Sequence, residues 1–202
     1  MHKALIFDVG KVLIPFDFKR GYQALENLCG LTVPEIRQRI AASGLVMPFE
    51  KGLIETSEFV EQLSATLGLN SDHDGFCHAW SCIFHDQLIP DATFAALAQR
   101  YRLLLLSNTN SLHFEMIRKN YSSLLEHFHD RILSFEVHAA KPEPEIFRAA
   151  IHRAGCRAEE CFFTDDLAEN VEAARREGMD AVQFESAEQL EREMRARGIA
   201  AC

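Results

Sequence analysis

Five short apolar runs constrain the fold of this chain more than any other feature. One covers residues 3–8 (KALIFD), and the others lie at 102–106, 131–135, 161–164 and 180–184. Runs of this length are typical of buried parallel strands. From residue 91 on, segments with apolar residues at helical spacing alternate with the last four apolar runs. They predict helices at 91–100, 112–120, 143–154, 168–177 and 187–197. This alternation predicts a Rossmann-like α/β fold with a parallel sheet.

A helical segment interrupts this pattern after the first strand. Residues 16–90 contain apolar residues at helical spacing, including a capping box at Thr32 and Glu35, and predict a bundle of about four helices. We expect an α/β core formed by residues 1–15 and 91–202, with residues 16–90 inserted as a small helical cap. The alternative, an N-terminal helical domain, would leave the strand at 3–8 without a sheet.

Composition excludes several classes of protein. The 202 residues are 48% apolar and 25% charged, which is typical of a soluble globular protein. Lysine and arginine number 21 against 30 acidic residues, a net charge of −9, and no Lys/Arg-rich stretch occurs, which argues against nucleic-acid binding. No apolar run approaches the roughly 18 residues of a membrane span. The composition leaves open whether the protein is a monomer or a homodimer.

The cysteines indicate neither a zinc site nor a redox motif. None forms a CxxC pair, and the first residues have no apolar signal-peptide region. We therefore expect reduced thiols in a cytoplasmic protein. The six are Cys29, Cys77, Cys82, Cys156, Cys161 and Cys202.

Polar side chains follow four of the predicted strands. Ligands of open parallel sheets bind at the carboxyl ends of the strands. Carboxylates there suit Mg²⁺, whereas hydroxyl, amide and ammonium groups suit phosphate oxygens. The residues in chain order are Asp8, Ser107, Asn108, Thr109, Lys141, Asp165, Asp166 and Asn170.

Each of these residues also has a simpler interpretation. An aspartate at a strand end is commonly a cap or turn residue, and Lys141 before Pro142 resembles a solvated loop residue. Asp165 and Asp166 are harder to explain in this way, because two adjacent like charges repel unless a cation lies between them. The ordered set is far more specific than any one member.

Four segments together resemble the haloacid dehalogenase superfamily: IFDVGKVL, LLLSNTN, KPEP at residues 141–144, and FFTDDLAEN. The match spans the whole chain, because residues 16–90 lie where that superfamily inserts its helical cap. Within it, the chain looks most like the sugar-phosphatase branch that resembles α-D-glucose-1-phosphate phosphatase.

The resemblance implies a role for each residue. Asp8 would be the nucleophile that forms an aspartyl-phosphate. Asp8, the Gly10 carbonyl and Asp166 would hold Mg²⁺, supported by Asp165 and Asn170, which lie behind the metal. Ser107 and Asn108 would bind phosphoryl oxygens, and Lys141 would neutralise both Asp8 and the phosphate.

One position departs from the superfamily pattern. Most of its phosphatases carry a second aspartate two residues after the nucleophile, and here that residue is Gly10, which has no proton to give. A good leaving group, a substitute such as Lys11, His78 or His85, or weak activity would each account for this difference.

We therefore expect a Mg²⁺-dependent phosphatase acting on a small phosphorylated metabolite, in particular a sugar phosphate. The alternatives are a 2-haloacid dehalogenase with the same nucleophile and a weakly active or non-catalytic phosphate-binding regulatory protein. Met47, Phe49, Trp80 and Phe84 either line a substrate pocket in the cap or form its apolar core.

Overall fold

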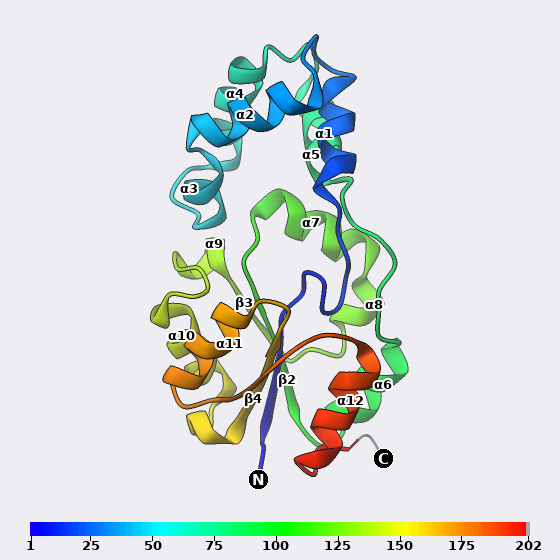
Figure 1. The fold of residues 1–202 in the computed structure, drawn as a ribbon, viewed down its shortest axis with the longest axis vertical. Coiled ribbons are helices and arrows are strands. Elements are labelled where there is room, and N and C mark those ends of the chain that lie inside the picture. The colour runs from blue at the N-terminus through cyan, green and yellow to red at the C-terminus, as the bar shows by residue number, and fades with distance from the viewer. Residues whose placement is uncertain (201–202) are drawn as a thin grey trace.

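A parallel sheet of five strands forms the centre of the α/β part of the molecule (Figure 1). The computed structural model describes residues 1–200. The strands lie in the order β3-β2-β1-β4-β5, so the first strand of the chain is central. They are β1 (Ala4–Phe7), β2 (Arg102–Ser107), β3 (Asp130–Leu133), β4 (Cys161–Asp165) and β5 (Asp180–Gln183). The predicted α/β fold with a parallel sheet is confirmed.

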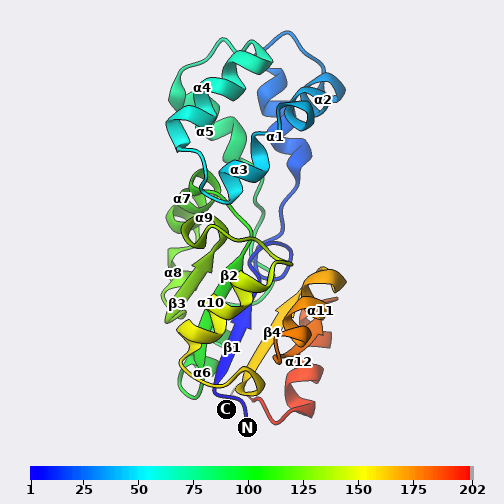
Figure 2. The same cartoon turned by 90° about the vertical axis from the view of Figure 1, so that its left-hand side faces the viewer.

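Helices cover both faces of this sheet (Figure 2). Every helix predicted after residue 90 is present, within one or two residues of its expected ends. Two four-residue helices and one 3-10 turn were missed, because they are too short to show a periodic pattern. The elements are α6 (Asp91–Ala98), α7 (Ser111–Asn120), α8 (Ser122–Leu125), α9 (Ser134–Val137), α10 (Pro144–Ala154), η1 (Ala158–Glu160), α11 (Ala168–Arg176) and α12 (Ala187–Ala196).

The alternation of side chains along β1 explains the two layers of the core. Leu5 and Phe7 face an apolar cluster formed with α6 and α12, where Phe7 meets Phe94 edge-to-face at 5.4 Å between ring centroids. Ala4 and Ile6 face the opposite cluster, formed with α10 and α11. Because β1 is buried on both faces, its sequence reads as a continuous apolar run.

Five helices, and not about four, form the inserted segment (Figure 1). They pack around their own apolar cluster, which contains Phe49, Phe59 and Trp80. The extra helix has only five residues and gives no periodic signal. The helices are α1 (Phe18–Glu26), α2 (Val33–Ser43), α3 (Val46–Glu50), α4 (Thr56–Leu67) and α5 (His73–Ser81).

The last helix of this segment is shorter than its sequence pattern indicated. Ile83 and Phe84 were expected in the helix with Trp80, but α5 ends at Ser81. Phe84 instead forms an antiparallel bridge with Phe16, and Asp17 N–H donates to the Ile83 carbonyl at 2.8 Å. The two connections between the helical segment and the sheet therefore run side by side.

A second set of contacts joins the far side of the helical segment to the α/β part. The Thr56 and Ser111 hydroxyl oxygens lie 2.7 Å apart. Gly52 has a φ of +62°, and a Cβ there would lie 2.1 Å from the Phe135 carbonyl oxygen, so only glycine fits. The loop after α3 thus rests directly on α9.

The described cysteines Cys29, Cys77, Cys82, Cys156 and Cys161 are free thiols; Cys202 lies outside the described residues. Within residues 1–200, no helix has both the length and the apolar composition needed to span a bilayer.

His113 on α7 joins the α/β part to α5. Its ring stacks on Trp80 with centroids 5.7 Å apart, and its Nε2 lies 3.0 Å from the Trp80 carbonyl oxygen. Since a carbonyl can only accept, Nε2 carries the proton and Nδ1 accepts from the Asn110 amide at 3.1 Å. Burial lowers the pKa of His113 to about 4, and the bond to Trp80 offsets this effect only in part.

We expect acid to destabilise the protein through His113. In the unfolded chain a histidine has a pKa of about 6.5, so between pH 6.5 and 4 the unfolded state binds more protons than the folded state. The free energy of unfolding should fall by about 2 kcal/mol from pH 7 to pH 5 on this account. Urea unfolding at both pH values should show a smaller fall for His113→Gln. The exposed His152, changed to Gln, is the control, and an unchanged pH dependence in His113→Gln would contradict the assignment.

Candidate active site

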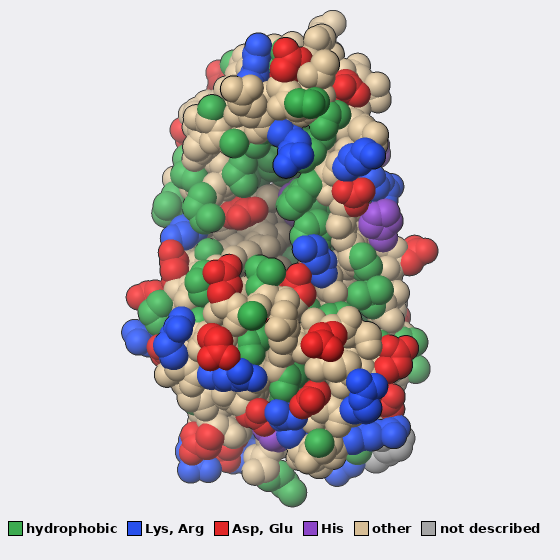
Figure 3. All heavy atoms as spheres, in the orientation of Figure 1, with side chains coloured by type: hydrophobic (Ala, Val, Ile, Leu, Met, Phe, Trp, Pro, Cys, Tyr) green, Lys and Arg blue, Asp and Glu red, His purple; other side chains and the backbone are tan. Residues whose placement is uncertain are grey.

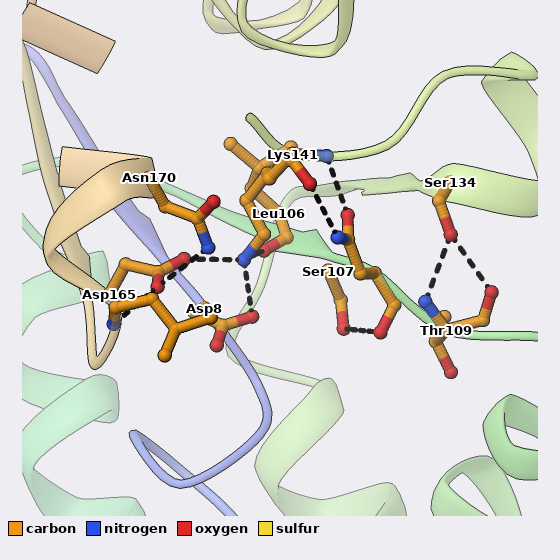
Figure 4. Close-up of polar contacts among 10 residues, drawn as sticks. Asp8, Leu106, Ser107, Thr109, Ser134, Lys141, Asp165 and Asn170 are labelled. Carbon is orange, nitrogen blue, oxygen red and sulfur yellow. Dashed lines mark hydrogen bonds and ion pairs between the residues drawn. The ribbon is translucent and has the colours of Figure 1, made fainter. Parts of the chain in front are cut away.

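The predicted polar residues meet at the carboxyl edge of the sheet (Figure 4). Asp8 directly follows β1, Ser107 ends β2 and Asp165 ends β4. Lys141 lies in the loop before α10 and reaches across to all three strand ends. Residues far apart in sequence therefore converge because parallel strands end at the same edge.

The Lys141 ammonium is the centre of this cluster. Its Nζ donates to Asp8 Oδ1 at 2.7 Å, to Asp165 Oδ2 at 2.6 Å and to the Leu106 carbonyl oxygen at 3.0 Å. All three donor positions of the ammonium are therefore used. Burial by itself would lower the pKa of Lys141, but the charges of Asp8 and Asp165 outweigh burial and raise it.

The carboxyl of Asp8 is costly to ionise in this setting. Burial raises its pKa, Lys141 lowers it and the neighbouring Asp165 raises it, and together these effects bring the pKa to about 6. One lysine thus serves two buried carboxylates, and a further cation beside Asp8 would stabilise its charged form.

Asp165 is fully buried and its carboxylate is saturated with donors. Its Oδ1 accepts from the Asn170 amide and from the Leu167 N–H, each at 2.9 Å, and its Oδ2 accepts from Lys141. These bonds fix the orientation of both Asp165 and Lys141. Asp165 therefore supports the cluster from behind.

Asp166 lies at the more open side of the cluster and keeps a free oxygen for a ligand. Burial and the charge of Asp165 raise its pKa, and the Lys11 ammonium, 3.6 Å away, opposes this shift. One oxygen from each of Asp8, Asp165 and Asp166 lies within 4.8 Å of the others. A divalent cation favours such a set of carboxylate oxygens.

The residues after β2 lie beside Lys141. The Asn108 amide donates to the Lys141 carbonyl at 2.9 Å and accepts from the Lys141 N–H at 2.7 Å. This pair of hydrogen bonds ties the loop that carries Lys141 to the end of β2. Ser107 is buried next to it, and its hydroxyl has only a long contact of 3.4 Å with the Asn108 carbonyl.

Phe16 occupies the space beside Gly10. An ideal Cβ on Gly10 would lie 2.7 Å from Phe16 Cε1, closer than side-chain atoms pack. Lys11 adopts a positive φ of 60° at the same turn, and its ammonium lies 5.4 Å from the centre of the Phe16 ring. The Phe16 ring therefore closes the space next to Gly10, the position where the superfamily pattern places an acid.

Three contributors to the site carried no sequence signal. The Leu106 carbonyl is a backbone group of an apolar residue. The Ser134 hydroxyl holds the loop after β2 by accepting from the Thr109 N–H at 2.9 Å, and Phe16 fills the space at Gly10. The two histidines considered as substitute acids, His78 and His85, are exposed on the helical segment and contact none of the residues in this cluster.

The fold and the site define a class of α/β protein with a cluster of charged side chains at the carboxyl edge of a parallel sheet, where open parallel sheets bind their ligands. A family model for haloacid dehalogenase-like hydrolases matches residues 2–178. The chain belongs to this family of hydrolases.

Relatives of known name agree with this membership. The phosphatase MT3486 of Mycobacterium tuberculosis is 31% identical over 185 residues, covering 88% of this chain and 85% of the relative. D-ribitol-5-phosphate phosphatase of Bacteroides thetaiotaomicron is 28% identical over 193 residues, covering 92% and 93%. A solved structure of a haloacid dehalogenase family enzyme from Bacteroides thetaiotaomicron, in complex with magnesium and inorganic phosphate, superposes with a TM-score of 0.80. It is 29% identical and covers 93% of this chain and 96% of that one.

Proposed function

We propose that the protein is a Mg²⁺-dependent phosphatase that hydrolyses a small phosphorylated metabolite, specifically the phosphate ester of a sugar or polyol. The observation that carries this proposal is the placement of the Lys141 ammonium between Asp8 and Asp165, with Asp166 in the same cluster. The names of the two relatives, both phosphatases, support the reaction class.

Asp8 is the proposed nucleophile. Its Oδ1 is held by Lys141, which leaves Oδ2 to attack phosphorus in line with the departing alcohol oxygen. The new O–P bond gives an aspartyl-phosphate as the ester O–P bond breaks, and the leaving alkoxide takes its proton from water. A second water then attacks phosphorus and breaks the bond to Asp8, which releases inorganic phosphate and restores the carboxylate. Lys141 holds the carboxylate in position and stabilises the anionic phosphoryl group.

Ser107 and Asn108 form the proposed phosphate cradle. The Ser107 hydroxyl is free to donate to a phosphoryl oxygen, since its contact with the Asn108 carbonyl is long. Because both polar atoms of the Asn108 amide bond to Lys141, we assign the phosphate contact of Asn108 to its backbone N–H. Its amide then positions Lys141.

The residues at the sheet edge fit a resident Mg²⁺. Burial raises the pKa of the Asp8 and Asp166 carboxyls. A cation between them would lower the free-energy cost of ionising both groups. These two carboxylates and the Gly10 carbonyl would hold the ion, with Asp165 and Asn170 behind them. When bound, Mg²⁺ supplies positive charge to the phosphoryl oxygens.

We further propose that residues 16–90 act as a cap over a core of residues 1–15 and 91–202. The helical segment has its own apolar cluster and meets the α/β part on two sides, through the bridge between Phe16 and Phe84 and through the contact of Gly52 with Phe135. A cap in this position encloses the leaving group and excludes water from Asp8.

A panel of phosphate esters, assayed with and without Mg²⁺, tests the proposed function. We expect hydrolysis of p-nitrophenyl phosphate and of sugar or polyol phosphates, its loss in EDTA, and its recovery on addition of Mg²⁺. EDTA-resistant release of chloride from 2-chloropropionate would instead identify a dehalogenase. A folded protein that binds phosphate and hydrolyses none of the esters would indicate a regulatory binding protein.

Introducing the missing acid should fail unless Phe16 is also changed. In Gly10→Asp the new Cβ collides with the Phe16 ring, so we expect no gain in kcat on a sugar phosphate. With Phe16→Ala as well, the carboxyl has room to protonate the leaving oxygen, and kcat should rise about 10-fold or more over Phe16→Ala alone. The gain should be smaller on p-nitrophenyl phosphate, whose leaving group needs no proton. A gain in Gly10→Asp alone would contradict the blocking role of Phe16.

A further inference from the structure

A cavity of about 280 Å³ lies among the cap helices and borders α7. It is bounded by α1, α2, α3 and α5, and His113 of α7 closes one side. Figure 3 shows the molecular surface hollowed between the helical segment and the α/β part. The volume is just below the range of roughly 300–1,000 Å³ for drug-sized ligands, which suits the alcohol portion of a small metabolite.

Glu50 is the unusual member of this cavity, whose walls are otherwise mainly apolar. It ends α3 and is half-buried, and burial raises the pKa of its carboxyl. No cation or hydrogen-bond donor among residues 1–200 contacts that carboxyl. A half-buried carboxyl that no protein group contacts is available to hydrogen-bond a ligand that enters the cavity.

Tyr22 contributes a second polar group to the same cavity. Its ring is half-buried on α1, and its hydroxyl has no hydrogen-bond partner among the described residues. His113 offers nothing further, because both of its ring nitrogens are bonded, to Trp80 and to Asn110. The residues that line the cavity therefore carry three polar groups with no partner among the described residues: the Glu50 carboxyl, the Tyr22 hydroxyl and the buried Trp80 indole N–H.

Hydrogen bonds connect this cavity wall to the loops of the site. The Ser134 hydroxyl donates to the Glu50 carbonyl oxygen at 2.6 Å and accepts from the Thr109 N–H at 2.9 Å. Thr109 directly follows Asn108, which holds Lys141. Glu50 is thus positioned by the same serine that positions the end of β2, next to the proposed phosphate cradle.

We propose that Glu50 and Tyr22 recognise hydroxyl groups on the alcohol portion of the substrate. This inference rests on the proposed phosphatase function and assigns recognition of the sugar or polyol portion of its substrate to these two residues. A hydroxyl donates to the Glu50 carboxylate and accepts from the Tyr22 hydroxyl, while the Trp80 and Ile83 side chains pack against the carbon chain. The carboxylate also disfavours a second anionic group at this end of the substrate.

The test is the ratio of kcat/KM for ribitol 5-phosphate to kcat/KM for p-nitrophenyl phosphate, which has no hydroxyl chain. Glu50→Met keeps the length of the side chain and removes its polar atoms, and the ratio should fall at least 10-fold, mainly through KM. Tyr22→Phe should lower it about 3-fold to 10-fold. Glu61→Met on α4, where the carboxylate is exposed, is the matched control and should leave the ratio unchanged.

A binding measurement separates recognition from chemistry. Free ribitol should raise the Tm of the wild-type protein and have a smaller effect on Glu50→Met. An unchanged ratio in Glu50→Met, or an equal loss on both substrates, would overturn the proposal while leaving the phosphatase function intact. Preference for phosphoethanolamine over ribitol 5-phosphate, lost in Glu50→Met, would overturn it by showing that the cavity takes a cation. Hydrolysis of neither test ester by Mg²⁺-loaded wild-type protein would overturn both.

Discussion

Asp8→Asn should abolish phosphatase activity without unfolding the protein. An amide is not a nucleophile toward phosphorus, and loss of a catalytic nucleophile lowers kcat by about 10⁴-fold or more. Asparagine still accepts from Lys141 at the position of Oδ1. Steady-state hydrolysis of p-nitrophenyl phosphate in Mg²⁺, compared with wild type, measures the effect.

The folding of Asp8→Asn provides the control for this result. A carboxyl with a raised pKa binds more protons in the folded state than in the unfolded state between about pH 4 and 6, so its charge costs stability above that window. Removing the charge should therefore leave Tm at pH 7 unchanged or higher. If the variant retained more than a few per cent of the wild-type kcat, Asp8 would not be the nucleophile.

Lys141→Met should cause the largest loss of stability of any single substitution in the site. It leaves Asp8 and Asp165 buried next to each other without their shared cation. Removing one partner of a buried ion pair costs about 3–5 kcal/mol, because the remaining charge is uncompensated. Urea unfolding at pH 7 measures this loss, and activity should disappear with it.

The double variant Lys141→Met with Asp165→Asn separates charge from packing. If uncompensated charge is the cause, removal of the Asp165 charge should restore part of the stability lost in Lys141→Met. Lowering the pH toward 5 should also narrow the difference from wild type, because Asp8 then takes up a proton in the variant. Equal stability of Lys141→Met and wild type at pH 7 would show that the ion pairs contribute nothing to folding.

Local pattern explains why so much of the fold could be predicted. Strand β1 is recognisable as a continuous apolar run, and the helix α10 is recognisable by its apolar residues at helical spacing. Both patterns lie within a few neighbouring residues. The helix α3 could not be predicted, because five residues are too few to show a helical period. Phe84 was assigned to a helix on spacing, but its place is set by the bridge to Phe16, a residue 68 positions earlier.

The sequence by itself determined which residues reach the carboxyl edge of the sheet, because Asp8, Lys141 and Asp165 each follow a recognisable strand or precede a recognisable helix. Only the tertiary structure decided which of their atoms are free. In the folded chain the Asn108 amide holds Lys141 and Phe16 closes the space at Gly10. The Glu50 carboxyl has no partner among residues 1–200. The physical reason is that periodicity records burial along one element, whereas a hydrogen bond depends on packing between elements far apart in the chain.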